Sequence, residues 1–544
     1  MNPSESLSTI GAIFPAEDAI PNQAILSLPI DQREYLIDGK ILSWDGELKE
    51  VWSPVCVRNS GGLARKSLGR FPLLTGDVAL KALDAAVRAY DNGRGVWPCM
   101  SVTDRIRSVE AFTFRMEEHK EEIIKLLMWE IGKSAVDSRK EYERTVKYIR
   151  DTIDALKDLD RASSRFAIEE GIIAQIRRGP LGVVLCCGPF NYPLNETFTT
   201  LIPALIMGNT VVFKPPSYGV LLFRYMLEAF RDSFPPGVVN TVYGKGREVL
   251  PPLMKSCKLD VLAFIGTSAV ADQLVSQHPK PHRMRLCLGL DAKNPAIILP
   301  DADLYLAVEE CVLGTLSFNG QRCTALKIIF VHTSIADEFL RRLSSAIGKL
   351  KIGMPWDDGV ALTPLPEDGK SKSMAGYIAD ALANGASVVN PGGGESVETF
   401  FYPAVLYPVN DNMKVYWEEQ FGPVIPVVPF DTIDLPLNYM EESNYGAQVS
   451  IFGADSERIA HMIDPLTNEV CRVNINSQCQ RGPDTFPFTG RKDSAVGTLS
   501  VADALRMFSI RTMVAAKEKD ENKRIITDIV REHRSNFLST DFIL

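Results

Sequence analysis

Apolar side chains recur with a helical period in the first part of the chain and as short runs in its middle. The helical period predicts helices over residues 77–92, 103–118 and 119–160. The short runs predict buried strands over residues 182–187, 210–213, 238–243 and 261–265. Because helix-length segments separate these runs, the pattern indicates a mostly parallel sheet covered by helices.

A second alternation of apolar runs and helical segments extends from residue 296 to residue 452 and predicts a second α/β unit. Upstream of both, residues 35–44 predict a hairpin whose turn is Asp38-Gly39. Residues 1–33 hold several prolines and no strong periodicity, which predicts an extension that lies on the surface or is partly disordered. Residues 515–536 are charged with a helical pattern and predict a tail that is solvated or contacts another subunit.

Composition narrows the class of protein. A chain of 544 residues exceeds what one core usually holds, so we expect two or three domains. The net charge of −9 argues against a nucleic-acid partner, which would need a basic surface. Ten cysteines without a CxxC pair fit a reducing compartment. No secretory signal and no membrane-spanning run is recognisable, so we expect a cytoplasmic protein without a membrane partner.

Cys323 is the candidate nucleophile. It lies in the stretch Asn-Gly-Gln-Arg-Cys-Thr-Ala at 319–325, between the helix-like run 303–318 and the apolar run 328–331. A thiol with a modestly lowered pKa is partly thiolate near neutral pH and attacks carbonyl carbon readily. The alternative is a buried, inert cysteine, since free cysteine packs as a small apolar side chain.

Five motifs together resemble the aldehyde dehydrogenase superfamily in order and spacing. They are FNYP at 190–193, FKPPS at 213–217, AFIGTSAVA at 263–271, GQRC at 320–323 and EEQFGPV at 418–424. The resemblance covers roughly residues 34–517 and implies an α/β fold with a variant Rossmann cofactor domain that lacks GxGxxG, an α/β catalytic domain and a small β oligomerisation element. Within the superfamily, RGPDTFPFTG at 481–490 resembles the non-phosphorylating, NADP-dependent glyceraldehyde-3-phosphate dehydrogenases.

The resemblance also implies a division of the chain. The expected parts are an extension at 1–33, an NADP-binding domain at 34–160 and 183–288, an oligomerisation element at 161–182 and 500–520, a catalytic domain at 289–499 and a tail at 521–544. Such proteins are usually homotetramers or homodimers in which a hairpin near 166–182 and the C-terminal strand exchange between subunits.

NADP is the cofactor that the resemblance implies, and no metal is expected. The implied contacts are Lys214, Ser217, Gly266, Thr267, Glu419 and Phe421. Ser217 carries information because NAD-preferring relatives often have a glutamate there, and its carboxylate would repel a 2′-phosphate. Gly266 and Thr267 open a helical segment after a strand, where backbone N–H groups attract phosphate. Read without the resemblance, Lys214 could be a solvated strand end and Glu419 part of a turn.

Asn191 is implied to hold the oxyanion together with the backbone N–H of Cys323, although an asparagine after Gly-Pro-Phe could also be an ordinary turn residue. The family motif ELGGKN supplies a glutamate 34 residues before the nucleophile as base for the hydrolytic water. This chain has Gly289 at that position, in the stretch GLDAKN at 289–294. Asp291 is therefore a candidate replacement base, or else a helix or loop cap.

A phosphorylated aldehyde is the implied substrate. In the glyceraldehyde-3-phosphate branch the phosphate is bound by residues that correspond to Arg144, Tyr192, Arg322 and Arg481. Guanidinium groups suit phosphate, although one arginine alone would more often form a surface ion pair.

The leading hypothesis is NADP-dependent oxidation of D-glyceraldehyde 3-phosphate to 3-phosphoglycerate through a thioester at Cys323. The alternatives are another semialdehyde dehydrogenase, a coenzyme A-acylating aldehyde dehydrogenase and, because Gly289 removes the usual base, a catalytically silent dinucleotide-binding protein.

Overall fold

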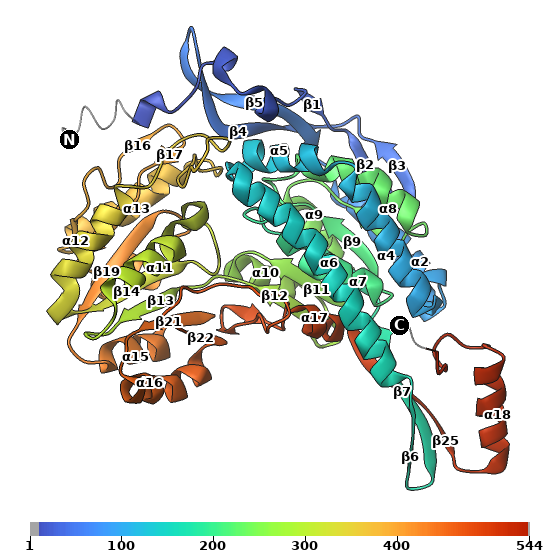
Figure 1. The fold of residues 1–544 in the computed structure, drawn as a ribbon. Helices are drawn as coiled ribbons and strands as arrows, with labels where there is room; N and C mark the ends of the chain where they lie inside the picture. Colours follow the sequence, from blue (N-terminus) through green and yellow to red (C-terminus); the bar gives the residue numbers. More distant parts are fainter. Residues whose placement is uncertain (1–9, 542–544) are drawn as a thin grey trace.

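Two large sheets, joined by the chain near residue 290, organise the computed structural model, which describes residues 10–541 (Figure 1). The first sheet has the order β10-β9-β8-β11-β12-β24, and its strands are parallel except β24. Its strands are β8 Val183–Cys187, β9 Thr210–Lys214, β10 Val239–Thr241, β11 Val261–Ile265, β12 Arg285–Gly289 and β24 Ala495–Val496. The four apolar runs predicted as strands at 182–265 are therefore confirmed.

The second sheet has seven strands in the order β15-β18-β19-β14-β13-β21-β22, again parallel except β15. Its strands are β13 Asn294–Ile298, β14 Leu326–His332, β15 Ser387–Val388, β18 Ala404–Tyr407, β19 Val424–Phe430, β21 Gln448–Phe452 and β22 Arg472–Ile475. The α/β fold class predicted from the sequence is confirmed. The chain changes sheet between Gly289, the last residue of β12, and Asn294, the first of β13.

Helices cover both sheets, as the alternation predicts. Those of the first half are α2 Gly76–Tyr90, α4 Val102–Glu117, α5 Lys120–Ile131, α6 Ala135–Ser163, α7 Asn195–Ile206, α8 Leu227–Ser233, α9 Gly246–Lys255 and α10 Ser268–Gln277. Those of the second half are α11 Leu304–Leu316, α12 Ala336–Ile347, α13 Lys370–Ala383, α14 Lys414–Trp417, α15 Asp434–Glu442 and α16 Ser456–Glu469. Among the described residues, no helix is both long and apolar enough to cross a bilayer.

The helix predicted over 119–160 is in fact two helices, α5 and α6. Gly132 ends α5 in the left-handed conformation, with φ at 68°, and Ser134 begins α6 by accepting a hydrogen bond from the N–H of Asp137. The apolar period runs through this break, so periodicity alone did not reveal it. The kink carries Lys133, whose side chain is completely buried.

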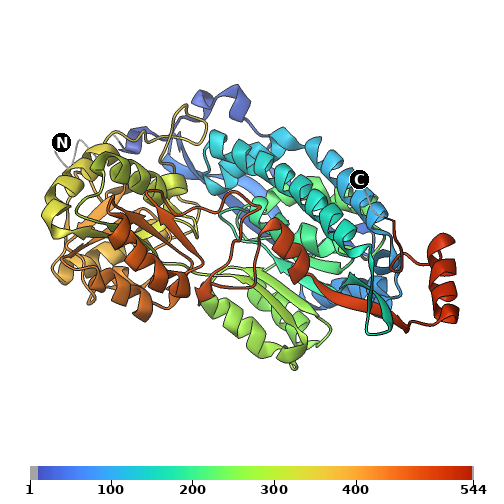
Figure 2. The same cartoon turned by 60° about the horizontal axis from the view of Figure 1, so that its bottom comes forward.

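A three-stranded antiparallel sheet projects from the body as an arm (Figures 1 and 2). It contains β6 Phe166–Glu169, β7 Ile172–Pro180 and β25 Ser509–Lys517, with helix α17 Val501–Met507 before β25 and α18 Asp520–Arg531 after it. The helix predicted over 515–536 was therefore wrong at its start, because residues 515–517 pair with β7. Ile168, Ile510, Met513 and Val514 on the arm are exposed.

The N-terminal extension packs on the body from residue 10 onward. Phe14 and Ala24 are buried, and β1 Ile30–Asp31 pairs with β5 Gly62–Pro72, which forms a long hairpin with β4 Leu48–Asn59. Of the two predictions for this segment, a surface position is confirmed for residues 10–33, while residues 1–9 lie outside the described part. The hairpin predicted at 35–44 is present as β2 Glu34–Ile37 and β3 Lys40–Ser43.

Candidate active site

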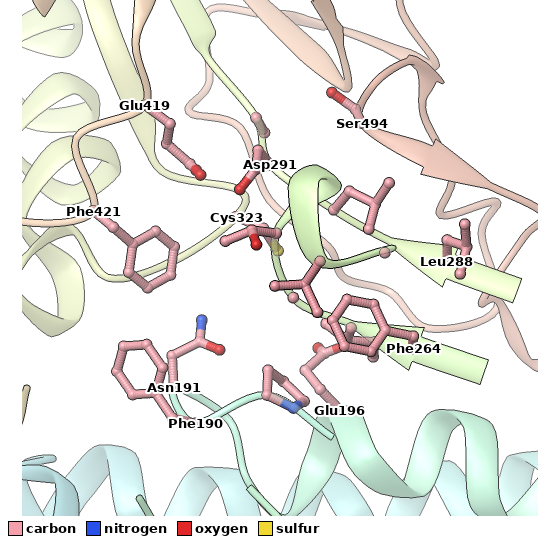
Figure 3. A pocket seen from close by; sticks show the side chains of 18 of the residues that line it. Phe190, Asn191, Glu196, Phe264, Leu288, Asp291, Cys323, Glu419, Phe421 and Ser494 are labelled. Atoms are coloured by element: carbon pink, nitrogen blue, oxygen red, sulfur yellow. The ribbon is translucent and has the colours of Figure 1, made fainter. Parts of the chain in front are cut away.

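A cavity of about 860 Å³ lies between the two sheets, where the carboxyl ends of β8, β9, β11 and β12 face the loop that carries Cys323 (Figure 3). In parallel α/β sheets this edge is the usual position of a ligand. The lining includes the predicted residues Cys323, Asn191, Asp291, Lys214, Ser217, Gly266, Thr267, Glu419 and Phe421. The fold thus brings together side chains from three widely separated parts of the sequence.

Cys323 sits in a tightly held loop between α11 and β14. The amide of Asn294 donates hydrogen bonds to the carbonyl oxygens of Cys323 (2.8 Å) and Ala325 (3.0 Å). Phe318 and Asn319, at the start of the loop, adopt positive φ values of 50° and 54°. Such a loop costs conformational energy and holds the thiol in a fixed place.

The pKa of Cys323 differs from the expectation. Burial, followed by the nearby Glu419, raises the pKa of the thiol, and Lys327 and Arg322 only partly oppose these effects. The prediction of a modestly lowered pKa was therefore wrong for this state of the protein. Desolvation exceeds the attraction of the two cations and so disfavours the thiolate.

Asn191 follows β8 and is buried on the cavity side, below Cys323 in Figure 3. Its amide donates a hydrogen bond of 2.8 Å to the carbonyl oxygen of Gln321, two residues before the thiol. The alternative of a turn residue that binds its own backbone is not what the structure shows. The side chain lines the cavity together with Cys323, and its role as an oxyanion donor stays a prediction.

Asp291 is engaged as a helix cap. Its Oδ2 accepts hydrogen bonds from the backbone N–H and the hydroxyl of Ser268, both at 2.7 Å, at the first residue of α10. Gly289, in contrast, leaves room on the wall. A Cβ atom there would meet only side-chain carbons of Ile265 and Leu499 at 3.5 to 3.6 Å, which is ordinary van der Waals contact.

Glu419 and Phe421 form the upper left wall of the site in Figure 3. Lys327 connects them to the nucleophile loop. Its ammonium lies 3.6 Å from Glu419 Oε1, 4.4 Å from the ring centre of Phe421, and donates to the carbonyl of Gly320 at 3.0 Å. Burial raises the pKa of Glu419 to about 7 despite this cation. Glu419 Oε1 is enclosed and accepts no hydrogen bond from the described residues.

These residues fit a dinucleotide with a 2′-phosphate. The unsatisfied Oε1 of Glu419 could accept a hydrogen bond from a ribose hydroxyl. At the other end of the cavity, Ser217 is exposed and Lys214 is buried. Within residues 10–541, the ammonium of Lys214 donates only to the carbonyl of Pro215. Burial lowers the pKa of Lys214, and the nearby Lys49 lowers it further. A 2′-phosphate would relieve the repulsion between these two cations.

Arg144, Tyr192, Arg322 and Arg481 form a connected group outside the lining of the main cavity, and Arg322 of this group is close to Cys323. Arg144 binds both oxygens of Asp484, at 2.8 and 2.7 Å. Arg481 is almost completely buried and pairs with Glu196 and with Asp484. Two of the three arginines predicted as phosphate ligands are therefore already paired with carboxylates.

Arg322 differs from the other two arginines because it has no carboxylate partner among the described residues. It donates to the carbonyl oxygens of Leu313 (3.2 Å) and Gly314 (3.0 Å) and to Gln478 Oε1 (3.3 Å). Its Nε is buried without a hydrogen-bond acceptor. Tyr192 lies nearby and packs on Lys133, whose ammonium is 3.5 Å from the centre of its ring.

Sequence reasoning missed three charged residues of this site, namely Glu196, Lys327 and Asp484. Glu196 lines the cavity from the first turn of α7, five residues after Asn191. A carboxylate in a segment that is otherwise uncharged and buried was the available signal, because a buried charge needs a partner. Asp484, which joins two arginines predicted as ligands, lies inside the loop that was singled out for Arg481.

Comparison with known proteins identifies the class. The model of the aldehyde dehydrogenase family matches residues 59–514. Together with two α/β sheets that enclose a cysteine, an asparagine and a dinucleotide-sized cavity, this match shows that the chain belongs to the aldehyde dehydrogenase family.

Among individual relatives, the chain is similar to the NADP-dependent glyceraldehyde-3-phosphate dehydrogenase of Pisum sativum, with 30% identity over 88% of this chain and 96% of the relative. The solved structure of the Bacillus halodurans C-125 NADP-dependent glyceraldehyde-3-phosphate dehydrogenase complexed with NADP superposes with a TM-score of 0.81, at 31% identity, over 90% of this chain and all of that one. The Methanocaldococcus jannaschii glyceraldehyde-3-phosphate dehydrogenase GapN complexed with NADP gives a TM-score of 0.76, at 26% identity, over 83% and 97%.

Proposed function

We propose that this protein oxidises a phosphorylated aldehyde with NADP, and that the substrate is D-glyceraldehyde 3-phosphate, which would yield 3-phosphoglycerate. The observation that carries the proposal is the cavity, which brings Cys323 and Asn191 together with the residues that fit a dinucleotide. Arg322, next to Cys323 in the chain, has no carboxylate partner among the described residues and keeps a buried Nε–H without an acceptor. The similarity to relatives named for NADP and glyceraldehyde 3-phosphate supports the same choice.

In this reaction the thiolate of Cys323 attacks the aldehyde carbon, and the new C–S bond converts the carbonyl oxygen into an oxyanion. The Asn191 amide and the Cys323 backbone N–H stabilise that oxyanion. NADP, when bound, supplies the acceptor for the hydride that leaves the same carbon. Of the residues that line the cavity, Lys214 and Ser217 would hold its 2′-phosphate, Gly266 and Thr267 would bind its pyrophosphate, and Glu419 and Phe421 would hold its nicotinamide ribose and ring. The product of this half-reaction is a thioester on Cys323.

Arg322 is the residue best placed to bind the substrate phosphate, since its charge is not already paired with a carboxylate. Arg144 and Tyr192 border the same region, while Arg481 contributes through the ion pairs that hold the loop at 481–490. A phosphate oxygen would accept a hydrogen bond from the unsatisfied Nε–H of Arg322.

Coenzyme A acylation is the second candidate, and Gly289 is the observation that favours it. Without the usual glutamate, a thiol could resolve the thioester in place of water. One assay separates the possibilities: NADPH formation measured with phosphorylated and unphosphorylated aldehydes, each with and without coenzyme A. Preference for glyceraldehyde 3-phosphate without coenzyme A is the expected result. Dependence on coenzyme A would favour the second candidate, and no NADPH from any aldehyde would refute both.

We further propose that the protein acts as a homodimer or homotetramer, because the projecting arm exposes apolar side chains on a strand, β25, that has a free edge. The domain limits given above, and a cytoplasmic location, are part of the same proposal.

A further inference from the structure

The cavity has glycine at position 289, where the family motif places the base, but it has carboxylates at other positions on its wall. Five carboxylates line the cavity: Glu196, Asp291, Glu367, Glu418 and Glu419. Glu367 pairs with Lys370, and Glu418 accepts a hydrogen bond from Tyr377. Asp291 caps α10 and Glu419 pairs with Lys327. Glu196 lies on the opposite side of Cys323 from Asp291 and Glu419 in Figure 3.

The position of Glu196 is fixed from two directions. Its backbone begins α7, where Leu194 N–H and Asn195 N–H donate to the buried carboxylate of Glu141 at 3.0 and 3.1 Å. Its Oε2 binds Arg481. Its other oxygen, Oε1, accepts no hydrogen bond from any described residue, although the side chain lines the cavity. The carboxylate is therefore oriented by one oxygen and has the other available.

Glu196 and Gly289 belong to the same wall. Leu499 connects them, because its side chain would lie 3.6 Å from a Cβ atom at position 289 and its carbonyl oxygen accepts a hydrogen bond of 3.2 Å from Arg481. Arg481 is in turn the partner of Glu196. The strand β24 brings this segment against β12, through the pairs Leu288 with Val496 and Gly289 with Ala495.

Glu196 lies at one end of a series of ion pairs. Arg144, Asp484, Arg481 and Glu196 form a chain of alternating charges that ends at the cavity wall. The start of α7 adds the partial positive charge of a helix N-terminus. A carboxylate that lines the same cavity as Cys323 and has one oxygen available is the arrangement that a general base requires.

We propose that Glu196 is the general base that activates the hydrolytic water in this protein, in place of the carboxylate that position 289 lacks. The inference rests on the proposed function, since it concerns the thioester formed there. Oε1 of Glu196 takes a proton from water while the water oxygen bonds to the acyl carbon. Collapse of the tetrahedral intermediate breaks the C–S bond and releases the carboxylic acid and the Cys323 thiolate. The proton on Glu196 then returns to that thiolate or to solvent.

The test uses Glu196→Gln with 4-nitrophenyl acetate and no cofactor. Acetylation of Cys323 releases one nitrophenolate, and each later turnover reports hydrolysis of the thioester. The parent should release product at a constant rate, whereas the variant should show a burst near one equivalent per active thiol and a steady rate at least tenfold lower. General-base assistance is typically worth about 10²- to 10⁴-fold. Mass spectrometry should then find the acetylated protein in the variant.

Two further variants sharpen the result. Glu130→Gln is the control, because Glu130 is a buried carboxylate outside the cavity that accepts hydrogen bonds from the backbone N–H groups of Val220 and Leu221. This variant should release nitrophenolate at the constant rate of the parent. Adding Gly289→Glu to Glu196→Gln should restore part of the steady rate, because position 289 has room for a side chain. If Glu196→Gln does not fold, Glu196→Asp can replace it. Aspartate keeps a carboxylate for Arg481, but its side chain is one methylene shorter, so its oxygens lie further from the acyl carbon. A burst of nitrophenolate followed by a slower steady rate is expected for this variant too.

A parent-like steady rate in the folded variant would overturn the proposal. Loss of the burst and the steady rate to the same extent would also overturn it, because that result assigns Glu196 to folding or binding rather than to hydrolysis. The assay needs neither NADP nor an aldehyde. Absence of NADPH formation from every aldehyde would therefore refute the proposed function separately, while the ester still decides the role of Glu196.

Discussion

Replacing Arg322 should cost more in recognition of the substrate phosphate than replacing Arg481, although the sequence motifs single out both residues. The reason is the state of their charges in the folded protein. Arg481 already pairs with Glu196 and Asp484, whereas Arg322 donates only to neutral oxygens and keeps one buried N–H without an acceptor. Loss of a charge-assisted hydrogen bond to phosphate costs about 1.5–3 kcal/mol, or about 10- to 150-fold in kcat/KM.

The effects on stability should follow the opposite order. Arg322→Ala removes hydrogen bonds to the carbonyl oxygens of Leu313 and Gly314, at about 0.5–1.5 kcal/mol each. Arg481→Ala leaves the buried carboxylate of Glu196 without its cation and Asp484 with only Arg144, and breaking a buried pair typically costs about 3–5 kcal/mol. The melting temperature should therefore fall much further in Arg481→Ala.

The assay compares kcat/KM for glyceraldehyde 3-phosphate with that for unphosphorylated glyceraldehyde in each variant, alongside its melting temperature. Arg322→Ala should lower the ratio by about tenfold or more, and Arg322→Lys should recover part of it, because an ammonium keeps the charge but not the planar fork. Arg144→Ala should fall between the two, since Arg144 is partly exposed while paired with Asp484. A folded Arg481→Ala protein with a larger change in the ratio than Arg322→Ala would refute this reasoning.

Three other predictions follow from single residues. Cys323→Ser should abolish NADPH formation and leave NADP binding intact. In the parent protein the pKa of the Cys323 thiol is raised, so alkylation of this thiol by iodoacetamide should still accelerate above pH 9.0. An alkylation rate that levels off near neutral pH would contradict this prediction. Ser217→Glu should weaken the binding of NADP relative to NAD by about tenfold or more, because the new carboxylate would repel the 2′-phosphate. Fluorescence titrations with both cofactors measure this, and an unchanged preference would show that Ser217 does not face the 2′-phosphate. Burial raises the pKa of Glu130 from 4.5 to about 7, so between these two pH values the folded state holds more protons than the unfolded state. The free energy of unfolding should therefore fall by about 3 kcal/mol as the pH rises from 4.5 to about 7. Urea unfolding should show this decline in the parent and not in Glu130→Gln; equal slopes would be the contrary result.

The sequence by itself determined the features that depend on neighbouring residues. Short continuous apolar runs between helix-length segments, such as 210–213 and 261–265, predict buried strands, and both are strands in the structure. The motif around Cys323 and the order of the other motifs pointed to the family, which the comparison confirms. The absence of a carboxylate at position 289 was also visible in the sequence, since it depends only on the spacing to Cys323.

The tertiary structure decided the features that depend on contacts between distant segments. Arg481 and Glu196 are 285 residues apart in the chain, and Arg144 and Asp484 are 340 apart, so no local pattern could show that these charges neutralise one another. The raised pKa of Cys323 has the same origin, because it reflects the burial of the thiol and the approach of Glu419. Whether a charged side chain binds a ligand or a neighbour is set by long-range packing, which fixes how far each charge is desolvated and what lies beside it.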